Sequence, residues 1–198
     1  MAILWPTPLG VDEYAAAGAE LVVPRLACPS CHQPMIRWGS YRRDVRLVTL
    51  FQLLIRRQRC RPCGRTHAVL PGFVTRGRLD AIEMIGPLLE QAANHRLVAE
   101  LARAIDVPPT TASGWWRRFQ GRAELLSVGF GRVCVATCGL VPRLSGTDAQ
   151  VAIGAIRAAF VAAARRFGEQ VGTLWRFANA VVGSELLTTN RNPSWSSA

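Results

Sequence analysis

The sequence contains no lysine, and all 24 of its basic residues are arginine. Acidic residues are also scarce, with 13 Asp and Glu in 198 residues, so the net charge is +11. The most apolar stretch, residues 149–164, is interrupted by Arg157 and is shorter than the ~20 apolar residues that a membrane span needs. We therefore expect a protein that has no membrane-spanning segment and does not bind a membrane.

The N-terminus lacks the features of an export signal. Residues 1–6 contain no basic residue, and no apolar run follows that is long enough for the core of a signal peptide. We therefore expect a cytoplasmic protein, in a reducing compartment where disulfides are rare.

The arginines are concentrated in one part of the chain. Residues 37–78 contain 11 arginines and one acidic residue, whereas residues 80–124 contain 5 arginines and 6 acidic residues. A concentrated positive charge attracts the phosphates of nucleic acids. The simpler alternative is a solvated face that keeps a small domain soluble. We favour nucleic acid because of the motif that follows the basic segment.

Two C-x-x-C pairs lie in or beside this basic segment. Cys28 and Cys31 form the first pair, and Cys60 and Cys63 form the second. A C-x-x-C turn directs two sulfurs to one point, so two such turns can close a tetrahedron around Zn²⁺. Four thiolates leave no open position for water. The spacing therefore predicts one structural Zn²⁺ ion with no catalytic role.

Disulfide bonding and redox chemistry are the weaker interpretations of the cysteine pairs. A disulfide framework needs an oxidising compartment, and a thioredoxin-like redox pair needs a βαβ context that this arginine-rich segment lacks. His32 and His67 flank the pairs, and each could replace a sulfur. Because four cysteines are available, we interpret both histidines as bystanders.

The sequence predicts an α+β fold whose first domain is a small β zinc ribbon over residues 25–78. It is preceded by an N-terminal segment, residues 1–24, with a short helix and then a strand over 20–23. The predicted ribbon strands are 35–38, 41–47, 50–59 and 66–71, with a turn at Gly39 and Ser40. Such a domain has too little core to be stable alone, so metal binding and folding should be coupled.

Residues 80–123 have the pattern of a helix-turn-helix. Asp80 is placed to cap the helix that precedes the motif. Asp106 stands at the turn, where the backbone needs a positive φ angle that Asp tolerates better than most residues. Pro108 and Pro109 then begin the second helix, where a missing N–H costs nothing. In DNA-binding proteins of this kind, the second helix enters the major groove.

The second helix carries polar and basic side chains on the face opposite its apolar residues. We expect Thr110, Ser113 and Arg117 to contact base edges, while Arg118 and Arg122 contact phosphates. Arginines of the ribbon would add salt-sensitive contacts with phosphates. The predicted DNA-binding residues are Thr110, Thr111, Ser113, Arg117, Arg118, Arg122, Arg42, Arg43, Arg56 and Arg57.

About half of the chain resembles a bacterial family of unassigned function that combines a zinc ribbon with a helix-turn-helix. This family is similar to the N-terminal DNA-binding region of insertion-sequence transposases. The matching segments are Cys28–Cys31, Trp38–Gly39, Arg59–Cys63, Thr66–Pro71 and Ala99–Phe119. The resemblance implies zinc at the four cysteines and DNA binding by the helical unit, but it implies no reaction. Asp106 and Ala112 depart from the Gly and the larger aliphatic residue that are usual there.

The remaining chain offers fewer signals. We expect an irregular linker at 124–147, in which Cys134 and Cys138 are buried free thiols. Residues 148–187 predict an antiparallel pair of helices that needs a partner surface. Residues 188–198 are polar, and we expect a disordered tail.

We expect a DNA-binding protein that is not an enzyme. The sequence shows neither the three carboxylates that hold two metal ions in common transposases nor a nucleophile–base pattern. The favoured function is a zinc-stabilised regulatory or transposase-related protein that binds double-stranded DNA, with a homodimer as a further expectation. The alternative is a zinc-dependent protein-interaction module that uses Trp175 or Phe177 of the C-terminal helices. A third hypothesis is RNA binding by the ribbon.

Overall fold

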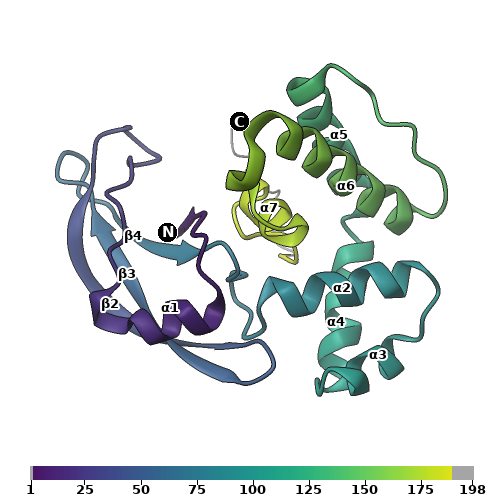
Figure 1. The fold of residues 1–198 in the computed structure, drawn as a ribbon, viewed down its shortest axis with the longest axis horizontal. Coiled ribbons are helices and arrows are strands. Elements are labelled where there is room, and N and C mark those ends of the chain that lie inside the picture. The colour runs from purple at the N-terminus through teal and green to yellow at the C-terminus, as the bar shows by residue number, and fades with distance from the viewer. Residues whose placement is uncertain (1, 189–198) are drawn as a thin grey trace.

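A computed structural model of the chain describes residues 2–188 and has an α+β fold (Figure 1). The fold class predicted from the sequence is thus confirmed. A four-stranded sheet occupies one side of the molecule, and most of the helices gather on the other side. Apart from Thr188, the tail predicted to be disordered lies outside the described residues.

The sheet has the strand order β1-β4-β3-β2. Its strands are β1 (Ala2–Trp5), β2 (Ile36–Arg46), β3 (Leu50–Arg59) and β4 (Thr66–Pro71). The strands β2, β3 and β4 pair in antiparallel fashion, whereas β1 lies parallel to β4. The predictions for β3 and β4 match the structure, and β1 was not predicted.

The predicted turn at Gly39 and Ser40 is wrong, because β2 runs through both residues as one long strand. The register of β2 against β3 shifts between Arg37 and Gly39, and Gly39 has a φ angle of 145°. A glycine and a change of register mark a β-bulge, which bends a strand without ending it. The chain instead reverses direction at residues 47–49, between β2 and β3.

The predicted strand at 20–23 is also absent. The helix α1 (Val11–Ala17) lies across the sheet and ends in the 3₁₀ turn η1 (Gly18–Glu20), after which the chain is irregular. The guanidinium of Arg56 donates hydrogen bonds to the carbonyls of Gly18 (3.3 Å) and Leu21 (3.4 Å). A side chain therefore satisfies backbone groups that a neighbouring strand would otherwise satisfy.

Between residues 82 and 188, the structure describes six α-helices and a short 3₁₀ turn. They are α2 (Ile82–Ala93), α3 (Val98–Ala104), α4 (Pro109–Gln120), α5 (Ala123–Cys138), α6 (Asp148–Phe167), η2 (Gly168–Val171) and α7 (Leu174–Val181). The linker predicted over 124–147 is wrong for most of its length, because α5 occupies it. The helices α5 and α6 pack along each other, so α6 finds its main partner before it in the chain rather than after it.

Asp80 does not cap α2, which begins two residues later with Ala81 at the N-cap position. Its buried carboxylate instead accepts hydrogen bonds from Arg46, at 2.6 Å from Nη2 and 2.7 Å from Nε. The backbones of Arg46 and Asp80 also form an isolated parallel bridge. This ion pair fastens the end of the β2–β3 hairpin to the start of the helical half.

One hydrophobic core joins the sheet to the helices. Leu53 and Phe73 from the first half belong to the same buried cluster as Ile85, Trp115 and Phe130 from the second half. The end of the sheet that carries the cysteines stands apart from this cluster. Among the described residues, the separate cluster of buried hydrophobic side chains at this end consists of Cys28, Met35 and Cys60, so apolar packing contributes little stability there.

Candidate metal centre and nucleic-acid surface

The two C-x-x-C pairs form matching turns. In each pair, the N–H of the first cysteine donates to the carbonyl five residues later, at 2.9 Å for Cys28 and 2.8 Å for Cys60. The residue after each pair has a left-handed backbone, with φ 57° at His32 and φ 70° at Gly64. Such a residue turns the chain back on itself. Each turn thus presents its two sulfurs on the inside of a tight loop.

The turns bring four sulfurs together. The Sγ atoms of the four cysteines all lie within 4.8 Å of one another. Contacts between the turns are 3.6 Å for Cys28 with Cys63 and 3.3 Å for Cys31 with Cys60. Both exceed the ~2.05 Å of a disulfide, whereas a tetrahedral ZnS₄ site with ~2.3 Å bonds requires sulfurs about 3.8 Å apart. The four cysteines therefore fit a metal ion.

The electrostatics of the cluster favour a cation. Burial raises the pKa of Cys28, but backbone N–H groups of Ser30 and Cys31 and neighbouring side chains lower it to about 5. For Cys60, the N–H of Cys63 lowers the pKa, while burial and the neighbouring thiols together raise it to about 12. One thiol thus ionises easily and makes the next more difficult to ionise. A divalent cation is what would hold all four as thiolates.

His67 is more than a residue that flanks the second pair. Its side chain is fully buried, and its Nε2 lies 3.8 Å from the Sγ of Cys28. Its Nδ1 is buried without a hydrogen-bond partner in residues 2–188. An N–H at Nε2 can donate to the thiolate of Cys28. Groups that donate to metal ligands in this way orient them and strengthen metal binding.

Replacing His67 by phenylalanine should weaken zinc binding by about 10-fold, the low end of the range for such supporting groups. Phenylalanine fills the buried space but cannot donate to Cys28. The measurement is competition for zinc against a chromogenic chelator. His32→Gly is the matched control, because His32 is exposed and its left-handed backbone suits glycine. Equal zinc affinity in both variants would show that His67 only fills space.

The α3–turn–α4 segment has the local geometry expected from the sequence. Asp106 adopts a φ angle of 52° at the turn, and Pro109 is the first residue of α4. Ala112, Trp115 and Phe119 form the buried face of α4. These residues anchor α4 in the common core, so the position of its opposite, outer face is fixed.

Five of the ten predicted DNA-binding residues have exposed side chains. Thr110, Ser113 and Arg117 lie on the outer face of α4, while Arg42 and Arg57 lie on β2 and β3. Thr111 and Arg118 are half-buried, and Nη1 of Arg118 donates to the carbonyl of Gly114 at 2.9 Å. These two residues are less accessible to a duplex than the first five.

The structure gives three further predicted contacts an additional role, because their guanidinium groups bind carbonyls in distant parts of the chain. Arg43 donates to Thr75 (2.9 Å) and Arg78 (2.8 Å). Arg56 donates to the carbonyls of Gly18 in η1 and of Leu21 just after it, as described above. Arg122 is 8% exposed and donates to the carbonyl of Thr188. These arginines hold distant segments together, so their guanidinium groups are less available to DNA phosphates than those of Arg42 and Arg57.

An exposed aromatic residue near the cysteines was not singled out from the sequence as a binding residue. Trp38 is half exposed, and the guanidinium carbon of Arg59 lies 4.4 Å from the centre of its ring. The bulge at Gly39 sits beside it. An exposed ring with a cation over it is suited to stacking on a nucleic-acid base.

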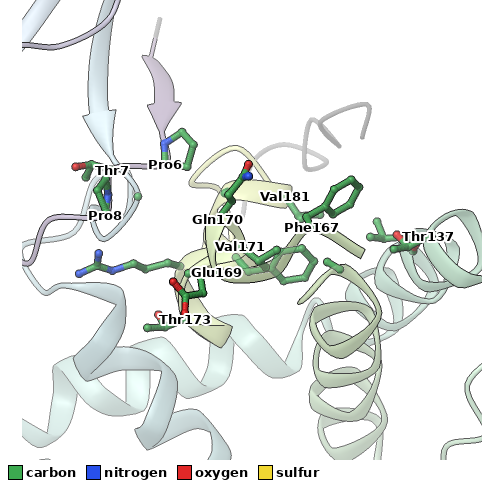
Figure 2. Close-up of a pocket in the computed structure, with 17 residues that line it drawn as sticks. Pro6, Thr7, Pro8, Thr137, Phe167, Glu169, Gln170, Val171, Thr173 and Val181 are labelled. Carbon is green, nitrogen blue, oxygen red and sulfur yellow. Dashed lines mark hydrogen bonds between the residues drawn. The ribbon is translucent and has the colours of Figure 1, made fainter. Parts of the chain in front are cut away.

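The cysteine turns and the α3–α4 unit lie at opposite ends of the molecule (Figure 1). Between the sheet and the helices α5–α7 lies a cavity of about 680 Å³, shown in Figure 2. Two charged residues, Glu169 and Arg176, are among the described residues that line it, and Arg176 pairs with Glu83 at 2.5 Å. Within residues 2–188, each helix is too short or too polar to span a lipid bilayer.

Residues 28–106 match a family described as a domain of unknown function (DUF6431). The matched segment contains both cysteine pairs, β2–β4, α2 and α3, and it ends at the turn residue Asp106. Searches of curated proteins and of solved structures found no match. The family's description names neither zinc ribbons nor transposases. The comparison therefore supports a shared domain around the cysteines and assigns it no function.

Proposed function

We propose that the protein is a zinc-stabilised DNA-binding protein in which α4 contacts the major groove. The observation that carries this proposal is the two-sided character of α4. Three buried residues fix one face to the core, and the other face presents Thr110, Ser113 and Arg117. Hydroxyl and guanidinium groups are the ones that hydrogen-bond to base edges. The net charge of +11 adds attraction to phosphates.

The four-cysteine site has a structural role in this proposal. Bound Zn²⁺ supplies the positive charge that holds four thiolates together, and it replaces the core that this end of the sheet lacks. Arg42 and Arg57 are the ribbon arginines that would contact phosphates, and we propose no catalytic step. Because the cysteine turns and α4 lie far apart, a duplex that meets both must be long or bent.

Arg117→Ala should relax sequence preference at one position of the binding site and cost about 1–3 kcal/mol. The reason is that its exposed guanidinium would donate to a single base. Arg57→Ala is the matched control. Loss of a phosphate contact should weaken binding to all DNA sequences equally, and it should reduce the slope of log affinity against log salt concentration by about 1. Fluorescence anisotropy with a family of single-base variants measures both effects. A uniform loss for Arg117→Ala would make it a phosphate contact.

The hypothesis of a protein-interaction module through Trp175 or Phe177 has little support in the structure. Trp175 is 6% exposed, and its Nε1 donates to Glu90 at 3.0 Å. The ring of Phe177 packs against Phe130 and Phe160, with ring centres 6.2 and 5.8 Å apart. Trp175 is buried and Phe177 is half-buried beside the 680 Å³ cavity, and both pack α7 against other helices.

A further inference from the structure

A different face of the helical half is open and apolar. It is formed by the outer sides of α5 and α6 and by the loop at 139–147, and it contains two adjoining grooves of about 630 and 710 Å³. Val141 and Pro142 of the loop line both grooves. Exposed apolar side chains on this face are Val128 (49%), Val135 (40%), Leu140 (68%), Val141 (77%) and Val161 (45%). Contiguous apolar surface of this kind marks an interaction site.

The charges around these grooves are all of one sign. Arg132 lines the first groove, and Arg157, Arg165 and Arg166 line the second, while no acidic residue is among the described residues that line either. Arg157 pairs with Glu90 at 2.5 Å. The side chains of Arg132 and Arg165 make no ion pair or hydrogen bond with the rest of residues 2–188. The face therefore combines an exposed apolar surface with two arginines, Arg132 and Arg165, whose charges are not paired within residues 2–188.

The apolar grooves and the unpaired arginines together favour one kind of partner over the others. A second copy would bring arginines against arginines, because residues 123–167 carry five arginines and two acidic residues. A nucleic acid would match the charge but not the apolar floor. A flat membrane surface would not fill two grooves. A helix with apolar side chains on one face and carboxylates beside them matches shape and charge together.

We propose that the α5–α6 face binds an acidic amphipathic helix of a partner protein. The apolar side chains of that helix enter the two grooves, and its carboxylates pair with Arg132 and Arg165. The described residues that line the two grooves all lie within 127–166, and none of them belongs to α3 or α4. In Figure 1 the loop at 139–147 runs along the outer edge of the molecule from α5 to α6. A helix bound there leaves the outer face of α4 accessible, so this interaction does not depend on the proposed DNA binding.

Selection from a displayed library of random 16-residue peptides on the full-length, zinc-loaded protein tests the proposal. Clones that also bind the Val141→Asp variant are removed. We expect enriched peptides with apolar residues at helical spacing and flanking Asp or Glu. Their affinity should fall at least 10-fold with Arg165→Glu and should fall as salt rises. Arg96→Glu, which changes an exposed arginine outside the grooves, should leave the affinity unchanged.

Several results would overturn the proposal. These are the absence of enriched peptides, enriched peptides without acidic residues, or equal binding by Arg165→Glu and the unchanged protein. Sedimentation that shows a dimer which Val141→Asp dissociates would assign the face to a second copy. Binding to vesicles of anionic lipid that Val141→Asp abolishes would assign it to a membrane surface. Duplex DNA binding by Val141→Asp, measured in parallel, keeps this test separate from that of the proposed function.

Discussion

Cys60→Ser should lose the bound zinc and unfold the cysteine end of the sheet. Cys60 is fully buried, and its sulfur lies 3.3 Å from that of Cys31 in the other turn. Structural zinc contributes about 10–16 kcal/mol of binding free energy, which is also folding free energy where no preformed site exists. The local buried set of Cys28, Met35 and Cys60 is too small to replace it.

Zinc content per chain and hydrogen exchange in β2–β4 together measure this effect. The unchanged protein should carry one zinc and protect the amides of these strands, whereas Cys60→Ser should carry none and exchange rapidly at the cysteine end of the strands. Cys138→Ser is the matched control, because Cys138 is an exposed thiol on α5 outside the cluster. Retention of one zinc and of protected strands by Cys60→Ser would contradict the four-cysteine site.

Gly86→Ala should lower the free energy of unfolding by about 3 kcal/mol, at the upper end of the usual range for overpacking. Gly86 lies on the buried face of α2, and a Cβ there would stand 2.1 Å from Cγ of Trp175. The indole cannot move away freely, because it is buried and its Nε1 donates to Glu90. The added methyl must therefore push α7 away from α2.

Gly131→Ala provides the comparison for this substitution. Gly131 lies inside α5, and a Cβ there would meet no atom within 4 Å. Alanine should thus raise the free energy of unfolding by about 0.5–1 kcal/mol, through its better helix propensity. Urea unfolding of the zinc-loaded variants compares the two. Similar stabilities would mean that Trp175 does not contact α2 as described.

The cysteine site and the turn that precedes α4 were predictable because both depend on the spacing of nearby residues. A C-x-x-C turn and a left-handed residue at Asp106 are properties of a few consecutive residues. By contrast, β1 is only four residues long and pairs with β4 more than 60 positions away, at Ala2 with Ala68. The sequence of a short apolar run does not indicate that it will pair with a strand so far away in the chain.

The helix α5 and the contacts of Arg43 and Arg122 within the chain were not predicted from the sequence, for different physical reasons. Gly129 and Gly131 suggested an irregular segment, since glycine disfavours helices. The buried Gly129 and Phe130 show that tertiary packing outweighs that preference. Arg43 and Arg122 find backbone carbonyls 32 and 66 positions away. A long guanidinium side chain that reaches so far cannot be distinguished by sequence from one that faces a phosphate.

The most direct measurement is selection of binding sites by the zinc-loaded protein from a random pool of duplex DNA, at two salt concentrations. DNA binding through α4 predicts an enriched motif whose bound fraction falls steeply as salt rises. The enriched motif should weaken when Arg117 is replaced by alanine. Binding without a motif would leave the arginines as phosphate contacts and remove α4 from recognition. Failure to retain any duplex at the lower salt would contradict DNA binding altogether.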